Sequence, residues 1–192
     1  KTCEVTKYIV NFVTKLQEEN RRLKEENEEL QKRIFDLEID NCDLECEVGS
    51  LEDRILEFEV SSKTVELAAV AVGCEPARIA KSMSFLIDES PIIIVAAGDA
   101  KISNSDYKAE FHTKAKMIPF EQVGEIIGHE AGGVCPFAVN DGVEIYLDES
   151  LKRFETVFPA VGSGNSAIEL NLEELYEYSK ALEWIDVCKL PE

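Results

Sequence analysis

The residues best suited to chemistry in this sequence lie in one segment, residues 128–137, with the sequence GHEAGGVCPF. A Gly-Gly pair, Gly132 and Gly133, followed by a proline lets backbone approach a ligand closely and can aim N–H groups at a developing oxyanion. On spacing alone, a structural turn is the simpler interpretation of the segment. Cys135 and His129 could act as nucleophile and base, but a buried thiol and a polar loop residue are the simpler interpretations.

Lys81 is a second candidate. It follows the sequence ARIA and precedes the apolar group MSF, and the pattern places it at the end of a helix that begins at Pro76. An ammonium there interacts favourably with the helix dipole, and a functional role is the alternative. The sequence contains no GxGxxG motif, no P-loop and no His, Cys and Asp set with metal-binding spacing. We therefore expect neither a cofactor nor a metal.

Composition limits the partners. The chain has 192 residues and a formal net charge of −19, so nucleic acid is repelled in general and any RNA contact must be local. The basic residues available for such a contact are Lys63, Arg78, Lys81, Lys101, Lys108, Lys114 and Lys116.

The six cysteines show no CxxC motif and no disulfide framework, so reduced thiols and a cytoplasmic location are expected. No stretch approaches the roughly 20 apolar residues of a membrane span, and no secretory signal is visible. Because the sequence begins at Lys1 without a methionine, an excised piece of a longer protein is consistent with it.

A heptad repeat occupies the first third of the chain and predicts a coiled-coil helix over residues 1–57. Three asparagines of the seam, Asn20, Asn27 and Asn41, favour a parallel, in-register dimer, because a seam asparagine needs a partner across the interface. The d positions are Ile9, Leu16, Leu23, Leu30, Leu37, Leu44, Leu51 and Phe58; the a positions are Val13, Asn20, Asn27, Ile34, Asn41, Val48 and Ile55.

The charges that flank the seam are mixed. In a parallel dimer three pairs attract, Glu19–Lys24, Arg33–Glu38 and Arg54–Glu59, and two repel, Asp40–Glu45 and Glu47–Glu52. The repulsive stretch coincides with a second apolar stripe formed by Phe35, Ile39, Cys42 and Cys46. A bundle or a crystal contact could use this stripe; alternatively, it docks on the C-terminal domain or on a third helix.

Residues 58–192 alternate helical and strand patterns and predict a mixed α/β (α+β) domain. Local signals mark several helix ends, such as the caps Thr64 and Asn171 and the terminating glycines Gly73 and Gly128. The expected helices are 65–72, 76–81, 104–109, 120–127 and 172–182; the expected strands are 58–61, 83–87, 92–97, 116–119, 143–147, 157–160 and 167–170.

Five short motifs in this half appear in an order that resembles the YbaK/ProX family of trans-acting aminoacyl-tRNA editing deacylases. They are TVELAA at 64–69, RIAKS at 78–82, GD at 98–99, GHEAGGVCPF at 128–137 and YLDESL at 146–151. The resemblance spans about residues 50–185, and the coiled-coil segment lies outside it. It implies a mixed α/β fold built around a curved, barrel-like sheet.

The resemblance also implies hydrolysis, in trans, of the ester that joins a mischarged amino acid to tRNA, often proline tRNA. Lys81 would hold the charged end of the substrate or its terminal adenosine, and the backbone of Gly132 and Gly133 would bind the carbonyl oxygen. The substrate's ribose hydroxyl would assist, so that no protein nucleophile is needed. The substrate-binding residues it implies are Ser82, Gly98, Asp99, His129, Pro136, Gly162 and Ser163.

The sequence departs from that pattern at Ala160 and Ala167, where cysteinyl-specific members carry polar residues, so the amino acid that is removed stays open. The acidic C-terminal part suggests a partner that presents the tRNA, such as an aminoacyl-tRNA synthetase, and the helix would dock or oligomerise the protein. The competing hypothesis is a non-catalytic assembly module that binds tRNA or a synthetase. It predicts a pocket that is filled, with the 162–166 loop closed over Lys81.

Overall fold

The computed structural model describes residues 2–60, 62, 64–130 and 132–191; within the first helix the side chains of residues 2–6, 8–11, 38 and 40–48 are not described. The chain divides into two compact units, Lys1–Asp53 and Arg54–Glu192. The sequence places the boundary between residues 57 and 58, beyond the first strand of the second unit.

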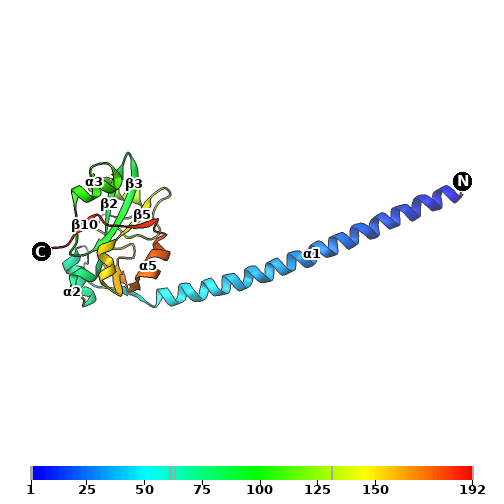
Figure 1. Cartoon of the computed structure of the whole chain (residues 1–192). Helices are drawn as coiled ribbons and strands as arrows, with labels where there is room; N and C mark the ends of the chain where they lie inside the picture. The colour runs from blue at the N-terminus through cyan, green and yellow to red at the C-terminus, as the bar shows by residue number, and fades with distance from the viewer. Residues whose placement is uncertain (1, 61, 63, 131, 192) are drawn as a thin grey trace. The chain divides into compact units, whose positions relative to one another are not determined.

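The first unit is a single helix, α1 (Thr2–Glu52), drawn in blue and cyan in Figure 1. The predicted helix is confirmed, although it ends before Ile55. Its seam is open in the single chain, since the side chains of Leu16, Leu23 and Leu30 are about half exposed (50%, 50% and 48%). The side chains of Asn41, Cys42 and Cys46, which the dimer and the second stripe invoke, lie outside the described residues. Of the helices that the structure describes, none is long and apolar enough to cross a membrane.

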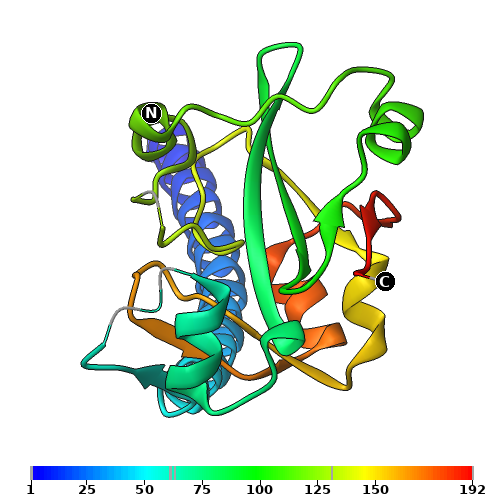
Figure 2. The same ribbon diagram turned by 90° about the vertical axis from the view of Figure 1, so that its left-hand side faces the viewer.

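The second unit is built on a six-stranded sheet with the order β8-β6-β2-β3-β5-β9. Its centre is an antiparallel hairpin of β2 (Ile79–Ile87) and β3 (Ser90–Ala97), which curves as Figure 2 shows. The fold prediction of a mixed α/β unit with a curled sheet is therefore confirmed. The flanking strands are β5 (Glu144–Asp148), β6 (Thr156–Pro159), β8 (Leu170–Asn171) and β9 (Glu183–Ile185).

Strand β3 is the core of this unit. The side chains of Ile92, Ile93, Ile94 and Val95 are fully buried, as expected for a strand that carries neighbours on both sides and is covered on both faces. The strand pairs antiparallel with β2 and parallel with β5. Two smaller pairings complete the unit: β1 (Ile55–Glu57) with β7 (Ser166–Ile168), and β4 (Lys101–Ile102) with β10 (Cys188–Lys189).

Four helices accompany the sheet, and two of them have the bounds that the sequence predicts. Helix α2 (Val65–Val72) is capped by the Thr64 hydroxyl, which accepts a hydrogen bond from the Leu67 amide, and it ends at Gly73. Helix α4 (Phe120–Ile127) ends at Gly128. The others are α3 (Asn104–Phe111) and α5 (Leu172–Ser179), and two single turns, η1 (Pro76–Arg78) and η2 (Glu149–Arg153), are 3-10 helices.

Several predicted elements are wrong. The helix expected from Pro76 to Lys81 is only the turn η1, and Lys81 lies in β2, because pairing with β3 and β6 outweighs the local helical pattern. The strand expected at 58–61 lies earlier, at β1, where it pairs with β7. Only Met117 of the expected strand 116–119 makes a bridge, to Phe85.

Two further differences concern the ends of the second unit. Helix α5 stops at Ser179 rather than at residue 182, because Lys180 adopts a left-handed conformation and β9 follows. Arg54 lies beyond α1 and pairs with Glu174, so the attraction expected between Arg54 and Glu59 across a dimer seam is wrong.

Candidate functional site

A cavity of about 160 Å³ opens beside β2, and five segments of the sequence line it. Lys81 and Ser82 come from β2, Gly132 and Val134 from the loop after α4, and the remaining wall comes from α2, β6 and β7. The polar lining is Ser62, Thr64, Lys81, Ser82 and Ser166; the apolar lining is Val65, Ala68, Ile79, Ala80, Val134, Phe158, Ala160 and Ala167. Lys81, Ser82 and Gly132 are thus the predicted site residues that share this cavity.

The Lys81 ammonium is held by the turn that follows β3. Its Nζ donates hydrogen bonds to the carbonyl oxygens of Gly98 (3.0 Å) and Ala100. An ammonium has three protons, so one remains for a ligand in the cavity. Burial lowers the pKa of Lys81 from its usual 10.5, and the nearby Cys188 and Asp99 oppose that shift.

Gly98 and Asp99 support Lys81 from outside the cavity. A Cβ on Gly98 would collide with the carbonyl oxygen of Pro76 and lie 2.6 Å from a methyl group of Val65, so only glycine fits there. The Asp99 carboxylate forms a bidentate pair with Arg153, with distances of 2.5 and 3.1 Å, and this pair holds the pKa of Asp99 below its usual value. Both residues therefore fix the turn whose carbonyl groups receive the ammonium.

The two glycines of the Gly-Gly pair differ in their surroundings. Gly132 is exposed to the cavity and has a φ of +92°, a conformation that glycine adopts without strain. Gly133 is buried, and its amide donates to the carbonyl oxygen of Glu130 at 2.9 Å. A Cβ on Gly133 would lie 3.1 Å from the carbonyl carbon of Ser163, so the missing side chain lets the two loops touch.

His129 and Cys135 hold the ends of this loop together. The Cys135 amide donates to His129 Nδ1 (3.5 Å), and the thiol lies 3.9 Å from each ring nitrogen. Burial lowers the pKa of His129 and raises that of Cys135, so both are neutral near pH 7. Cys135 is only 1% exposed, which agrees with a buried thiol rather than an attacking one.

The remaining predicted residues lie outside the cavity lining. Ser163 shares a hydrogen bond with the Ser166 hydroxyl (2.6 Å), and Gly162 forms a turn with a φ of +79°. Pro136 faces a different cavity, which Ala138 and Ser179 also line. The structure therefore places Ser163 behind a wall residue and Pro136 away from Lys81.

Sequence reasoning missed part of the lining. Thr64 and Val134 lay in the family motifs and Ser166 in the 162–166 loop, but none of them was assigned to the site, and Ser62 carried no local signal. The pairing of β1 with β7 and the loop after α4 bring these residues to the cavity. The hydroxyl of Ser82 is buried and has no hydrogen-bond partner in the part of the chain that the structure describes. Within the same described ranges no cluster of three His, Cys, Asp or Glu residues could hold a metal ion.

Comparisons with known sequences identify a family. A family model described as "Aminoacyl-tRNA editing domain" matches residues 59–178. The chain is 55% identical over 139 residues to the uncharacterized protein YwhH of Bacillus subtilis strain 168, which covers 72% of this chain and 88% of that protein. It is 33% identical over 95 residues to a proline–tRNA ligase of Bacillus licheniformis, covering 48% of this chain but only 16% of the ligase.

Solved structures agree on the fold of the second unit. A structure described as a candidate trans-editing enzyme for prolyl tRNA synthetase aligns with a TM-score of 0.65 at 26% identity, covering 73% of this chain and 93% of that one. The hypothetical protein APE2540 aligns with a TM-score of 0.64 at 25% identity, covering 71% of this chain and 91% of that one.

The tight contact at Gly98 generates a stability prediction. Gly98→Ala should lower the free energy of unfolding by about 2 kcal/mol, because the added methyl group must displace the Pro76 carbonyl or Val65. The matched control is Gly124→Ala in α4, where the nearest atom to a Cβ is 3.9 Å away. That change should instead stabilise by up to about 1 kcal/mol, as alanine does in a helix. Urea denaturation measures both, and a Gly98→Ala variant as stable as the wild type would contradict the contact.

Proposed function

Because the chain belongs to the aminoacyl-tRNA editing domain family, we propose that its second unit hydrolyses the ester of a mischarged tRNA. The observation that carries this proposal is that Lys81 and Gly132, which lie far apart in the sequence, line one small cavity. A non-catalytic assembly module would be expected to have a filled pocket. The cavity beside Lys81 therefore favours a hydrolase, which acts where translation takes place, in the cytoplasm.

Lys81 is proposed to bind the sugar of the terminal adenosine where the ester is attached, at the edge of the cavity. Two of its three protons are used by Gly98 and Ala100, and the third is free to meet an acceptor in the cavity. A positive charge repels the cationic α-amino group of an aminoacyl ester and attracts phosphate or sugar oxygens. Lys81 would therefore orient the nucleotide side of the ester.

The carbonyl oxygen of the ester is proposed to lie against the loop of the Gly-Gly pair. The Gly133 amide is already bound to Glu130, so Gly132 is the better placed of the two to donate to an oxyanion. The role of Gly133 would be to allow the close approach of the loop at 163–164. Water would attack the carbonyl carbon, the bond to the ribose oxygen would break, and that oxygen would leave with a proton.

No protein nucleophile is required in this scheme. The one cysteine near the loop, Cys135, is buried and protonated, and its partner His129 is engaged with the Cys135 amide. A free hydroxyl of the substrate's own ribose is the group proposed to assist the attacking water. Positioning and oxyanion binding would then supply most of the catalysis.

The amino acid removed is proposed to be small. A cavity of about 160 Å³ is below the roughly 300–1,000 Å³ of drug-sized ligand sites, so it accommodates an aminoacyl group rather than a whole nucleoside. Its wall carries short side chains at Ala68, Ala160 and Ala167. The similarity to proline–tRNA ligases and to a candidate prolyl trans-editing enzyme supports proline tRNA as the carrier.

A partner would help to deliver the tRNA. With a net charge of −19 the protein has little general affinity for RNA, and tethering to a synthetase would raise the local concentration of the tRNA without strong binding. The half-exposed seam of α1 is proposed to form a parallel dimer or to dock such a partner.

The first functional prediction concerns Lys81. Lys81→Ala and the bulkier Lys81→Met should lower deacylation by about 100-fold or more, since each removes a charged donor from the site, while the thermal midpoint changes little. The assay is hydrolysis of Ala-, Cys-, Ser- and Thr-tRNA, carried on proline tRNA and on the cognate tRNAs. Turnover by Lys81→Met at the wild-type rate would contradict the role assigned to Lys81.

Lys152→Met is the matched control, because Lys152 pairs with Glu149 on the surface and does not line the cavity. It should keep wild-type activity. If the folded wild-type protein hydrolyses none of these aminoacyl-tRNAs, the assay is repeated with prolyl-tRNA synthetase added. Continued silence would favour the assembly module.

A second prediction follows from the pKa of Lys81. If the protonated amine is the active form, background-corrected activity should fall as the pH rises through the folded-state pKa, which lies below 10.5 because burial disfavours the charge. The ¹³Cε resonance of Lys81, assigned by its loss in Lys81→Arg, should titrate at the same pH. A resonance that titrates at or above 10.5 would contradict the burial of the ammonium.

A third prediction tests the seam of α1. Replacing Asn20 and Asn27 with valine should raise the thermal stability of the helical part and broaden the distribution of oligomeric states, because asparagine layers specify a parallel dimer at a cost in stability. Analytical ultracentrifugation measures the states. A wild type that sediments as a monomer at all concentrations would rule out the dimer itself, whereas an unchanged dimer in the variant would show that these layers do not specify it.

A further inference from the structure

The strand that follows the long helix supports one wall of the cavity from behind. Strand β1 pairs antiparallel with β7, with Leu56 opposite Ala167 and Glu57 opposite Ser166. Ala167 and Ser166 are both lining residues. The wall of the cavity at β7 therefore rests on a strand that lies outside the matched family region of residues 59–178.

Hydrogen bonds continue this support beyond the strand. The Phe58 amide donates to the Asn165 carbonyl oxygen (2.8 Å), and the Asn165 side chain donates back to the Phe58 carbonyl oxygen (3.1 Å). The Ser62 amide donates to the carbonyl oxygen of Gly164 at 2.7 Å, and Ser62 itself lines the cavity. Residues 55–58 and 62 thus follow the segment 164–168, which contains the loop before β7.

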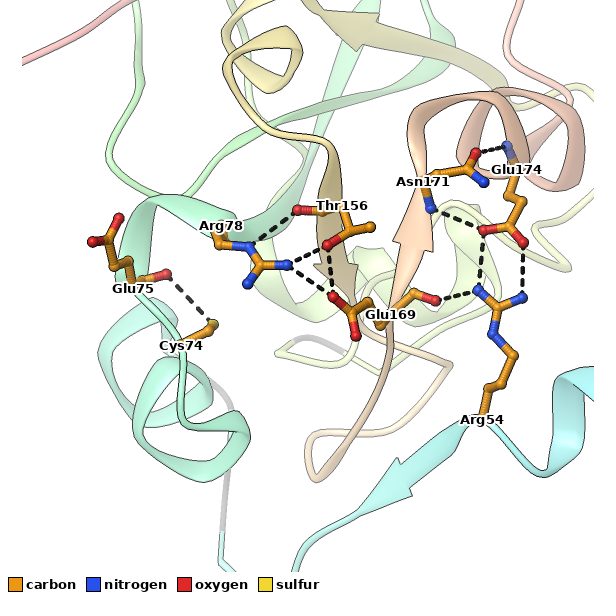
Figure 3. A network of polar contacts seen from close by, with 8 residues as sticks. All are labelled: Arg54, Cys74, Glu75, Arg78, Thr156, Glu169, Asn171 and Glu174. Atoms are coloured by element: carbon orange, nitrogen blue, oxygen red, sulfur yellow. Dashed lines mark hydrogen bonds and ion pairs between the residues drawn. The ribbon is translucent and has the colours of Figure 1, made fainter.

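Arg54 anchors the start of this segment, as Figure 3 shows. Its guanidinium donates to both carboxylate oxygens of Glu174, at 2.8 and 3.0 Å, and to the carbonyl oxygen of Glu169 at 2.5 Å. A bidentate pair of this kind fixes direction as well as distance. Arg54 therefore joins the chain that enters β1 to both ends of the segment 169–174.

The Glu174 carboxylate, which accepts the hydrogen bonds of Arg54, is itself held in place. One oxygen of Glu174 also accepts from the Asn171 amide (2.9 Å), and the Asn171 side chain accepts from the Glu174 amide (2.9 Å). Together these bonds form the capping box of α5. Arg54 is thus attached to the fixed end of a helix rather than to a mobile surface carboxylate.

We propose that Arg54 is a positioning residue for the editing pocket, which acts by holding β1 against β7; this inference rests on the proposed deacylase function. The two paired strands have only three residues each, and a two-stranded ribbon of that length is marginal without further support. The hydrogen bonds from Arg54 to Glu174 and Glu169, here called the Arg54 clamp, supply that support at the end of β1 nearest α1.

A displacement of the wall would also reach the Gly-Gly loop. The backbone of Ser163 and Gly164 lies within 3.1 to 3.4 Å of the position that a Cβ on Gly133 would take. Gly164 in turn accepts the hydrogen bond of Ser62. Release of Arg54 would therefore loosen both the side-chain wall at Ala167 and the loop that carries Gly132.

The experiment compares full-length Arg54→Ala, Arg54→Lys and Glu174→Gln with the wild type. Amide hydrogen exchange of the segment 160–168 should become about tenfold faster in Arg54→Ala, because the wall opens locally more often. Arg54→Lys should be intermediate, since a lysine cannot reproduce the bidentate geometry. The matched control is Lys152→Ala, which removes a surface ion pair away from the cavity and should leave this exchange unchanged.

The kinetic arm separates positioning from mere stability. At a temperature well below the thermal midpoint, Arg54→Ala should lower kcat/KM about tenfold on the preferred aminoacyl-tRNA, as small misplacements at a reacting centre do. Arg54→Ala should also lower the preference for small over larger aminoacyl groups, measured as the ratio of their kcat/KM values, by about threefold, because a looser wall excludes larger aminoacyl groups less well. A variant that only unfolds more readily loses activity on all substrates alike. Arg54→Lys should retain part of the wild-type preference for small aminoacyl groups.

Each outcome has a distinct meaning. Unchanged exchange at 160–168 in Arg54→Ala and in Glu174→Gln would overturn the clamp, whatever the activity. Faster exchange with an unchanged ratio of kcat/KM would show that the clamp is structural only and overturn the positioning role. If no aminoacyl-tRNA is hydrolysed by the wild type, the deacylase function fails and the positioning role fails with it, while the exchange data still decide whether Arg54 holds the wall.

Discussion

A half-buried ammonium is the constraint on which the candidate site depends. Removing the Lys81 charge from water is costly unless acceptors replace the lost hydration, and the carbonyl groups of Gly98 and Ala100 are those acceptors. Their turn can occupy this place only because Gly98 has no side chain, and the Arg153 pair with Asp99 holds it there. Gly98 and Asp99, which the family resemblance implied as substrate-binding residues, therefore support Lys81 from outside the cavity.

On the opposite side of the cavity, the Gly-Gly loop is likewise held by contacts outside the cavity. The Gly-Gly loop is held by the His129 and Cys135 contact at its ends and touches the loop before β7 through Gly133. That second loop is hydrogen-bonded to residues 58 and 62. The cavity is therefore lined by α2, β2, β6 and β7 together with loops that hold one another. The shape of its loop side depends on anchors that lie outside the cavity.

The sequence predicts local structure well where the signal is local. Helices α2 and α4 have their predicted bounds because a capping threonine and terminating glycines mark their ends. Lys81 was assigned to a helix because its local pattern is helical, and only pairing with β3, reached through a turn, makes it part of a strand. The wall residue Ser166 and the strand β1 depend on a pairing across about a hundred residues, which periodicity does not reveal. Residue types and spacing singled out Lys81 and the Gly-Gly pair, and the family resemblance gave them roles, whereas geometry alone distinguishes Gly132 from Gly133.

In the proposed function, the size of the cavity and the charge of the chain would together place tRNA selection outside the pocket. A cavity of about 160 Å³ would hold only the aminoacyl end of a tRNA, and a net charge of −19 would give little attraction for the rest of it. In the Bacillus licheniformis proline–tRNA ligase the similar region is 16% of a longer chain. Here the preceding element is a helix of 51 residues with an exposed apolar seam. A helix that recruits a second protein would help to deliver the tRNA, because a modest association raises the local concentration of the substrate as effectively as a covalent link of suitable length.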